Sequence, residues 1–495
     1  MRPIRRIVIL GGGSAGWMAA ATLSEAFQGT LDIHVVESEA IGTVGVGEAT
    51  LPQMRAFNLA LGLDEADFLR RTHGTIKLGI EFADWGQLGD RYMHVFGGVG
   101  RDLGLVPFHH FWTRMRRQGH AQPLDAYALN GLAACRKRFA PQAAKNVPLA
   151  YAYHFDAGLY ATTLRELSQS RGVQRTEGRV LQAMQHGDDG FVTALAMESG
   201  ECIDGDLFID CSGFRGVLIE ETLRTGFEDW SHWLPCDRAV AVPCESAGAP
   251  DLFTRASARG AGWQWRIPLQ HRTGNGLVFC SEHLGEDEAT AQLMASLDAP
   301  PLAEPRLLRF KAGRRRKAWH RNVVAIGLSA GFLEPLESTS LFLVQSALSR
   351  LIQFFPDTSF DLDGINEYNR LADDELERIR DFVILHYHLT RRDDTPFWRH
   401  MRAMDVPDTL QRRLRNFACA GHLHSQARDL FTESNWLQVL VGQGLLPQRH
   451  HPLADRLTDA ECSFFLEHVH RQLGELVDTL APHGPALARE LALSP

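Results

Sequence analysis

The first forty residues alternate short hydrophobic runs with a glycine-rich turn. Residues 6–10 are apolar and β-branched, which predicts a buried strand, whereas residues 17–27 carry consecutive alanines and predict a helix. A second apolar run at residues 32–36 predicts another strand. Strand, helix and strand within about 30 residues indicate a β-α-β unit, the building block of a parallel sheet.

The turn between the first strand and the helix carries three glycines in G-x-G-x-x-G spacing. Gly11 permits a tight turn, Gly13 lets a pyrophosphate approach the backbone, and Gly16 lets helix and strand pack closely. Glu37 ends the second strand about 20 residues further on, where a carboxylate that binds ribose is expected. The pattern predicts a dinucleotide site; a glycine-rich turn followed by a chance acid is the alternative.

Later hydrophobic runs complete the predicted fold. Residues 206–213 and 322–327 are apolar and predict two more buried strands of the parallel sheet. Residues 231–283 are rich in strand formers, and the chain beyond Leu362 is mostly helical in pattern. This order predicts an α/β protein with a Rossmann-like dinucleotide domain, a β-rich substrate region and a helical C-terminal lobe. The return of the chain to the parallel sheet at residues 206–213 resembles the two-domain flavoprotein monooxygenase type.

Residues 75–85 alternate apolar and polar side chains, which predicts one half-buried strand. Lys77 and Glu81 fall on the polar side of this pattern. Two interpretations stay open at this point: a solvated Lys77–Glu81 pair, or a lysine in a cavity that the strand lines.

Three other segments carry candidate chemistry. The basic run at residues 306–317 is interpreted as a solvated face, for which a place near the cofactor phosphates is one hypothesis. Residues 338–340 are hydroxyl side chains that precede a predicted helix at 341–354, whose free N–H groups make a candidate anion site. The glycine-rich loop at 41–52 is expected to form a strap over the cofactor, or else a plain surface loop.

Composition narrows the class of protein. The 495 residues, 44% hydrophobic and 22% charged, can bury a large core. A net charge of -9 disfavours nucleic acid or an anionic membrane as the main partner, and no apolar run approaches the roughly 20 residues that span a bilayer. The eight cysteines form no C-x-x-C pair and are interpreted as reduced core residues of a cytoplasmic protein. The doublets His109-His110 and His450-His451 lack metal-ligand spacing, so no metal is predicted.

Several motifs together resemble the flavin-dependent tryptophan halogenases. Residues 262–268 read GWQWRIP, which matches the family hallmark G-W-x-W-x-I-P, and the N-terminal turn reads GGGSAGW. Lys77 lies in a matching K-L-G-I segment, and residues 334–339 read EPLEST. The similarity covers most of residues 1–400 in the same order and, more loosely, the C-terminal helices.

The resemblance implies a halogenase that uses reduced FAD, O2 and a halide ion to make hypohalous acid. That oxidant would cross a tunnel to Lys77, which would hydrogen-bond it or form a haloamine. Glu337 would orient the electrophile and take up the proton of the substrate ring. The remaining site positions implied are Thr339 and Ser340 for the halide, Trp263 and Trp265 for shielding the flavin, and Gly11, Gly13, Ser14, Ala15, Gly16, Glu37, Ala49, Val180, Leu328 and Leu341 for FAD.

The same resemblance implies a division of the chain near residue 385. The N-terminal part would be a box-like FAD-binding module, and residues 386–495 would be a mainly helical lobe over the substrate site. Within residues 1–385, the dinucleotide-binding parts are expected at about 1–85, 155–220 and 310–355, and the β-rich substrate region at about 225–305.

Two departures from the family pattern bear on specificity. Ser340 stands where the best-known members have glycine after the halide threonine, so bromide is expected to serve at least as well as chloride. The chain has no tyrosine after Tyr387, whereas members that act on free tryptophan use C-terminal tyrosines. An indole, a substituted indole or a larger aromatic is therefore expected as substrate, with His109, Phe111 and Trp436 as candidates for its ring platform.

The single nucleotide fingerprint predicts that a separate flavin reductase supplies the reduced FAD. A homodimer is an open alternative for the assembly. Two rival functions remain: an aromatic hydroxylase of the same fold, which usually has Gly-Asp where this chain has Gly327-Leu328, and a flavin-binding module without catalysis. Halide-dependent product formation and turnover with supplied reduced flavin distinguish the three functions.

Overall fold

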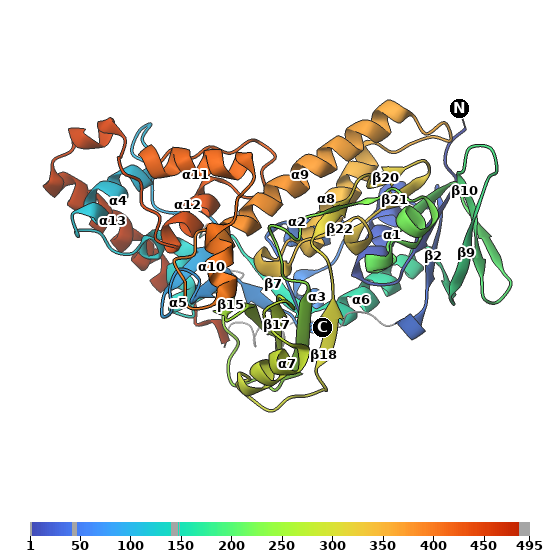
Figure 1. The fold of residues 1–495 in the computed structure, drawn as a ribbon, viewed down its shortest axis with the longest axis horizontal. Coiled ribbons are helices and arrows are strands. Elements are labelled where there is room, and N and C mark those ends of the chain that lie inside the picture. Colours follow the sequence, from blue (N-terminus) through green and yellow to red (C-terminus); the bar gives the residue numbers. More distant parts are fainter. Residues whose placement is uncertain (1, 42–46, 140–146, 148, 485–495) are drawn as a thin grey trace. The chain divides into compact units, whose positions relative to one another are not determined.

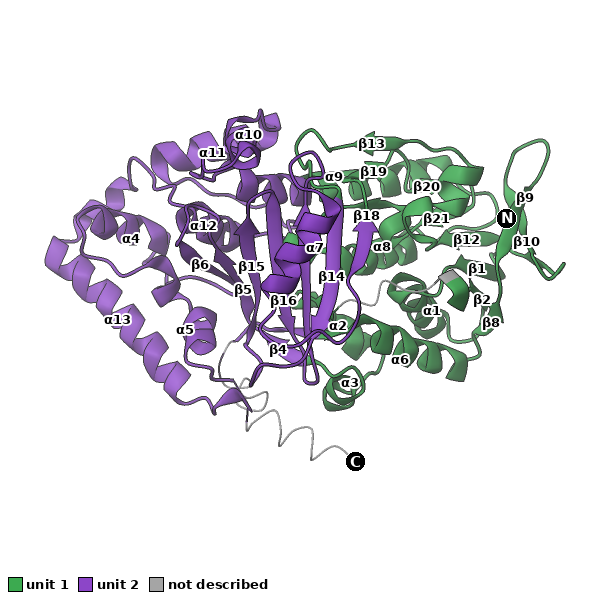
Figure 2. Cartoon of the chain, turned by 60° about the horizontal axis from the view of Figure 1, so that its bottom comes forward, with its two compact units in different colours: residues 1–74, 155–237, 309–377 green, residues 75–154, 238–308, 378–495 purple. Residues whose placement is uncertain are grey.

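The computed structural model describes residues 2–41, 47–139, 147 and 149–484 (Figure 1). The chain divides into two compact units, each assembled from three segments (Figure 2). Unit 1 comprises Met1–Gly74, Phe155–Asp237 and Arg309–Glu377. Unit 2 comprises Thr75–His154, Arg238–Leu308 and Arg378–Pro495.

Unit 1 is built on a six-stranded sheet in the order β20-β21-β12-β1-β2-β8. All neighbouring strands are parallel except the edge pair β20–β21, which confirms the predicted parallel α/β sheet. The side chains of Ile7, Val8 and Ile9 in the central strand are fully buried, as expected where helices cover both faces. The strands are β1 (Arg6–Leu10), β2 (Asp32–Glu37), β8 (Gln174–Glu177), β12 (Leu207–Asp210), β20 (Trp319–His320) and β21 (Val323–Ala325).

Helix α1 (Ser14–Phe27) follows β1 directly and contacts helices α6 and α8. It begins three residues before the predicted start, because Gly13 is extended and leaves the next residues free to turn into the helix. Other elements of unit 1 are α2 (Gln53–Ala60), α3 (Glu65–Arg71), α6 (Ala157–Ser170), α8 (Ser340–Gln353), β3 (Gly47–Ala49), β9 (Val180–Gln185), β10 (Val192–Met197), β11 (Cys202–Asp204), β13 (Phe227–Asp229), β19 (Gly313–Arg315) and β22 (Gly331–Phe332).

Unit 2 is built on a seven-stranded sheet in the order β18-β14-β17-β16-β15-β5-β6. Its neighbours pair antiparallel from β14 to β15 and from β5 to β6, whereas β15 and β5 are parallel. This sheet confirms the predicted β-rich region. Its strands are β5 (Gly79–Ala83), β6 (Arg91–Val95), β14 (Arg238–Cys244), β15 (Phe253–Arg259), β16 (Gly262–Pro268), β17 (Thr273–Phe279) and β18 (Arg306–Arg309).

The rest of unit 2 is mostly helical. Helices α4 and α5 both contact α13, and α12 contacts strand β6. The helices are α4 (Phe108–Arg117), α5 (Leu129–Cys135), α7 (Glu286–Ala295), α10 (Pro396–Ala403), α11 (Asp408–Ala420), α12 (Glu433–Gly442) and α13 (Asp459–Asp478); the long α9 (Leu362–His388) contains the boundary between the units. Among the described residues, none of the helices is both long enough and apolar enough to cross a membrane.

The segment predicted as one half-buried strand is two strands that belong to different sheets. β4 (Thr75–Lys77) pairs with β7 (Ala152–Asp156), whereas β5 pairs with β15 and β6. Leu78 joins them: its N–H donates to the carbonyl of Leu252, and its carbonyl accepts from the N–H of Phe96. Because of this change of sheet, Lys77 is fully buried, and the expected polar face shared with Glu81 is wrong.

The basic run at residues 306–317 is also only partly the solvated face that was expected. Arg314 and Arg315 are buried in strand β19. Arg314 forms ion pairs with Asp373 and with Glu228, and Arg315 forms one with Glu220 at 2.9 Å. Opposite charges from neighbouring elements make these arginines part of the core.

The eight cysteines form no disulfide, but the prediction that they are core residues holds only in part. Cys236, Cys244, Cys280 and Cys462 are buried. The remaining four are Cys211, which is partly exposed, and Cys135, Cys202 and Cys419, which are exposed.

Candidate functional site

The glycine turn after β1 has the geometry that a dinucleotide needs. Gly11 has a φ of 118°, and a Cβ atom there would lie 2.2 Å from the carbonyl oxygen of Cys211. A Cβ at Gly16 would lie 1.8 Å from the carbonyl oxygen of Gly11, so helix and turn pack at backbone contact. A Cβ at Gly13, by contrast, would meet nothing within 4 Å. The turn is thus closed on its protein side and open where a phosphate would approach.

The N-terminus of α1 supplies the charge complement. Gly13 is its N-cap and has no side chain to bond the first N–H groups, so these remain available to an anion. Ser14 and Ala15 form the first turn, and the Ser14 hydroxyl lies 3.5 Å from the carbonyl oxygen of Ala157. These residues fit the diphosphate of FAD.

Glu37 ends β2 beside this turn. Its carboxylate accepts from the indole N–H of Trp17 at 3.3 Å and from the Arg175 guanidinium at 2.5 Å. A Cβ on Gly12 would lie 1.3 Å from a Glu37 carboxylate oxygen, so only glycine leaves the carboxylate its place. Glu37 is therefore held in one position at the edge of the turn.

Two further loops follow strands of the same sheet. Because β1, β12 and β21 are parallel, the loops after them lie at one edge, where ligands of open α/β sheets bind. A Cβ at Gly327 would lie 2.9 Å from the Cβ of Ala15, so the loop after β21 closes on the glycine turn. Leu328, partly exposed, is next in that loop, and Leu341 is buried in the first turn of α8.

Sequence reasoning missed two residues that shape these loops. Asp210, fully buried at the end of β12, accepts hydrogen bonds from the backbone N–H groups of Ser212, Leu218 and Ile219 at 2.8–2.9 Å. Arg315 donates to the carbonyl oxygens of Phe214 and Ser329 and so joins the two loops. The sequence did contain a signal for Asp210, because it is an acidic residue at the end of an apolar strand. No local sequence pattern indicates the contacts of Arg315.

Thr339 is the N-cap of α8, the helix predicted to offer an anion site. Its side chain makes no capping hydrogen bond, and within the described part of the chain its fully buried hydroxyl has no hydrogen-bond partner. Ser340 begins the helix. A buried hydroxyl without a partner beside free helix N–H groups suits a small anion.

Glu337 and Lys77 are both withdrawn from solvent. Glu337 ends a short 3-10 helix (Pro335–Glu337) of unit 1 and is 1% exposed. Lys77, in unit 2, is 0% exposed, and its Nζ lies 5.4 Å from the centroid of the Phe96 ring. It is the one lysine that is buried among the described residues. A buried amine and a buried carboxyl are candidates for a functional site.

Trp263 and Trp265 lie on one face of β16, as predicted, with their rings 6.1 Å apart. Both are buried. Trp265 pairs across the sheet with Gly276, and a Cβ there would lie 2.0 Å from the indole ring. The glycine thus leaves the space that the indole occupies.

The three candidates for a ring platform fall into two clusters of unit 2. His109 and Phe111 lie on α4, where the His109 ring bonds the carbonyl of Gly421 at 2.8 Å and Phe111 packs against Phe465. Trp436, on α12, packs against Phe382 and other residues, including the Arg413 guanidinium at 4.2 Å from its ring centroid.

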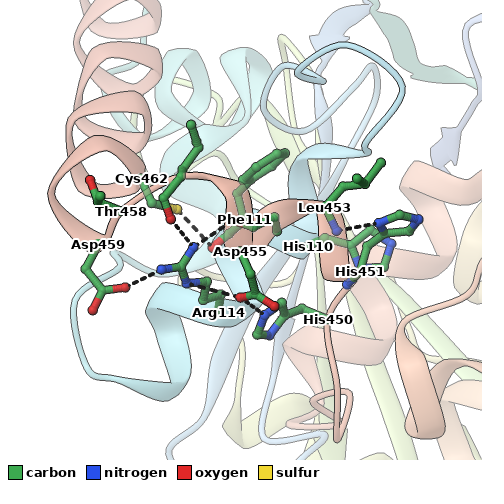
Figure 3. A network of polar contacts seen from close by, with 12 residues as sticks. His110, Phe111, Arg114, His450, His451, Leu453, Asp455, Thr458, Asp459 and Cys462 are labelled. Atoms are coloured by element: carbon green, nitrogen blue, oxygen red, sulfur yellow. Dashed lines mark hydrogen bonds and ion pairs between the residues drawn. The ribbon is translucent and has the colours of Figure 1, made fainter.

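Helix α4 is anchored to the segment before α13 by a polar network (Figure 3). Arg114 donates to the carbonyl oxygens of Ala454 and Leu457, at 2.6 and 2.8 Å, and pairs with Asp459. The His451 backbone N–H donates to the His110 ring at 3.2 Å. Burial, aided by neighbouring histidines, lowers the pKa of His110 to about 3, so this imidazole is neutral. These contacts hold α4, with its buried aromatic side chains, against the segment before α13.

The histidine doublets use ring nitrogens in hydrogen bonds within the protein. Among the described residues, the group whose ligand atoms come within 4.8 Å of one another is Cys280, Glu282 and His283. Glu282 and His283 are exposed.

The other cofactor candidates lie at strand ends of unit 1. Ala49 ends β3 and is buried, and Val180 begins β9 and is partly exposed. The expected strap, residues 41–52, falls partly outside the described residues, since only Ile41 and residues 47–52 are described.

The parallel sheet, the open glycine turn and the second, mainly antiparallel sheet define a two-domain FAD-binding protein. Comparisons with known proteins narrow this class. The chain matches the model of the tryptophan halogenase family over residues 6–459. The tryptophan 6-halogenase ThaL of Streptomyces albogriseolus is 33% identical over 99% of this chain and 98% of its own length. The tryptophan 7-halogenase RebH of Lentzea aerocolonigenes is 34% identical over 91% of each.

Similar solved structures are also halogenases. Xcc4156, a flavin-dependent halogenase from Xanthomonas campestris, is 48% identical, with a TM-score of 0.96 over 99% of each chain. BrvH, a flavin-dependent halogenase from Brevundimonas sp. BAL3, is 45% identical, with a TM-score of 0.94 over 98% of this chain and 99% of its own. The chain belongs to the tryptophan halogenase family, and it is a flavin-dependent halogenase, an oxidoreductase.

Proposed function

We propose that this enzyme halogenates an electron-rich aromatic ring, an indole derivative, with Lys77 as the residue that delivers the halogen. The observation that carries the proposal is the complete burial of Lys77 beside the Phe96 ring. A solvated lysine would lose hypohalous acid to water, whereas a buried one holds it where only the ring can react. In the overall reaction, reduced FAD, O2, a halide ion, a proton and the arene give FAD, the aryl halide and two water molecules.

Reduced FAD, when bound, would supply with O2 the oxidising equivalent that turns halide into hypohalous acid. Gly11, Gly13 and Gly16, with the N-terminus of α1, would bind its diphosphate, and Glu37 its ribose. Ala49, Val180, Leu328 and Leu341 would line it. The proposed source of reduced FAD is a separate reductase, because the chain carries one nucleotide fingerprint.

The Thr339 hydroxyl and the first N–H groups of α8 would hold the halide. Lys77 would then hold hypohalous acid by a hydrogen bond, or its neutral amine would take the halogen to form a haloamine and release water. In the final step the C–X bond forms at the ring, the O–X or N–X bond breaks, and Glu337 takes the ring proton. Trp263 and Trp265 would keep the substrate from the flavin.

An indole is the proposed substrate class because relatives are named as tryptophan halogenases and because this chain lacks tyrosines beyond Tyr387 to hold an amino-acid moiety. His109, Phe111 and Trp436 stay candidates for the ring platform. Bromide is proposed to serve at least as well as chloride, since Ser340 adds a side chain at the halide segment.

The test supplies the purified enzyme with FAD, NADH, a flavin reductase and bromide, and screens indole, substituted indoles and tryptophan by mass spectrometry. The proposal expects halide-dependent brominated indole. A hydroxylated product without halide would instead establish the rival hydroxylase, and O2 uptake without any product from the panel would refute an indole substrate.

A further inference from the structure

A second buried residue of unit 2 lies next to Lys77 and has no part in the proposed chemistry. His154, on β7, is 0% exposed. Its Nδ1 lies 3.1 Å from the Thr75 hydroxyl oxygen, and its Nε2 lies 2.9 Å from the Thr254 hydroxyl oxygen. Both ring nitrogens of a fully buried histidine are therefore engaged.

The direction of these hydrogen bonds fixes the tautomer. The Thr75 hydroxyl donates its one proton to the carbonyl of Pro268 at 2.7 Å, so towards His154 it can only accept. His154 must then carry its proton on Nδ1, and Nε2 accepts from Thr254. Burial, together with the charges of Lys77 and His483, lowers the pKa of His154 well below its ordinary value, so the ring is neutral.

Strand register places His154 and Lys77 on one face. Thr75 pairs with His154 and Lys77 pairs with Ala152 in the antiparallel β4–β7 ladder. Side chains two residues apart share a face, so His154 is the diagonal neighbour of Lys77, about 7–8 Å away between backbones. Ala152, the direct partner of Lys77, has only a methyl group and leaves the space to the longer side chains.

β4 has only three residues, so its ladder to β7 alone holds it weakly. The chain Thr254–His154–Thr75–Pro268 ties it to β15 and to the end of β16, the strand that bears Trp263 and Trp265. A shift of about 1 Å at a reacting group costs on the order of 100-fold in rate. The position of Lys77 thus depends on His154. Because His154 is neutral, it adds no second positive charge beside Lys77.

We propose that His154 is the positioning residue for Lys77: through its Nδ1–H bond to Thr75 it fixes the lysine strand relative to the tryptophan strand. The inference rests on the proposed delivery of halogen by Lys77. Loss of the hydrogen bond to Thr75 should reduce product more than loss of the bond to Thr254, because Thr75 and Lys77 lie on the same strand, β4.

Two substitutions separate the two bonds. In His154→Asn the amide N–H₂ reaches the position of Nδ1 and can still donate to Thr75; in His154→Gln the amide reaches the position of Nε2 and meets Thr254 instead. His110→Gln is the matched control, because His110 is also a buried neutral histidine of unit 2 and lies on α4. Each variant is assayed for FAD binding, melting temperature, O2 uptake with supplied reduced flavin, and brominated indole per O2 consumed.

We expect His154→Asn to keep product per O2 within about threefold of wild type, and His154→Gln to lose roughly 100-fold with O2 uptake unchanged. His110→Gln should keep its product ratio whatever its melting temperature. The pH dependence of the ratio above pH 6 should be the same in wild type and His154→Asn, since His154 does not titrate there.

Equal amounts of brominated indole per O2 consumed for His154→Asn and His154→Gln, at matched melting temperatures, would overturn the inference. A change in the pH dependence of this ratio in His154→Asn would overturn it too. Full product from Lys77→Met would instead remove the proposed function, so the two failures are distinguishable.

Discussion

Replacement of Lys77 by methionine is the sharpest test of the chemistry. Lys77 is fully buried, so Lys77→Ala would remove three buried methylene groups, worth about 0.8 kcal/mol each, and leave a cavity that brings the cost to roughly 2–4 kcal/mol. Methionine keeps most of the side-chain volume and removes only the amine. A lost product could then be assigned to chemistry rather than to unfolding.

We expect Lys77→Met to bind FAD and to consume O2 from reduced flavin as wild type does, because Lys77 is proposed to act only after hypohalous acid has formed. Brominated product should fall at least about 1000-fold, which corresponds to about 4 kcal/mol of barrier. Lys77→Arg should fail as well, since a guanidinium does not deprotonate and its fork has another shape.

The assay follows O2 with an electrode and product by mass spectrometry in one reductase-coupled reaction, with a melting curve for each variant. Lys311→Met is the control, because Lys311 is exposed and pairs with Asp229. Wild-type product from Lys77→Met would refute the role of the lysine, and a parallel loss of O2 uptake and product would place its role at the flavin.

Four more results are expected. Thr339→Val should raise the KM for bromide roughly three- to tenfold at unchanged FAD affinity, since one hydrogen bond is lost; an unchanged KM contradicts the halide role. Bromide should support turnover at least as well as chloride at equal concentration, and Ser340→Gly should move the preference toward chloride; a clear chloride preference of wild type argues against this. NADH should not be oxidised without reductase, which an absorbance trace at 340 nm checks. Burial raises the pKa of Glu48 to about 7 from 4.5. The folded state therefore favours the neutral acid, and the protein loses stability as the pH rises from 4.5 to 7. Glu48→Gln should melt at a higher temperature than wild type at pH 8 but not at pH 4.5.

The parallel sheet and its glycine turn could be predicted because their signals are local. Strand β1 matches the predicted bounds, and β2 ends at Glu37 as expected. Spacing of glycines encodes a backbone geometry directly, whereas the burial of Arg314 and Arg315 depends on acids that other segments bring to them, such as Asp373. No local pattern distinguishes a paired buried arginine from a solvated one.

The surroundings of two candidate site residues could not be predicted from the sequence. The alternation around Lys77 left a solvated pair and a lysine in a cavity as open interpretations, because it assumes one sheet throughout. The change of sheet at Leu78 buries Lys77. Threonine is a common N-cap residue type, yet the Thr339 hydroxyl makes no capping bond to α8. Both differences arise from long-range packing, which a single strand or helix segment does not encode.

The contact between Trp265 and Gly276 restricts how this enzyme can evolve. The indole occupies the volume of any side chain at position 276, so Gly276→Ala should be harmful alone yet tolerated once a smaller ring stands at 265. The two positions are epistatic, and the order of changes matters. The change at position 265 must therefore come first, and a library that varies position 276 alone would miss the combination.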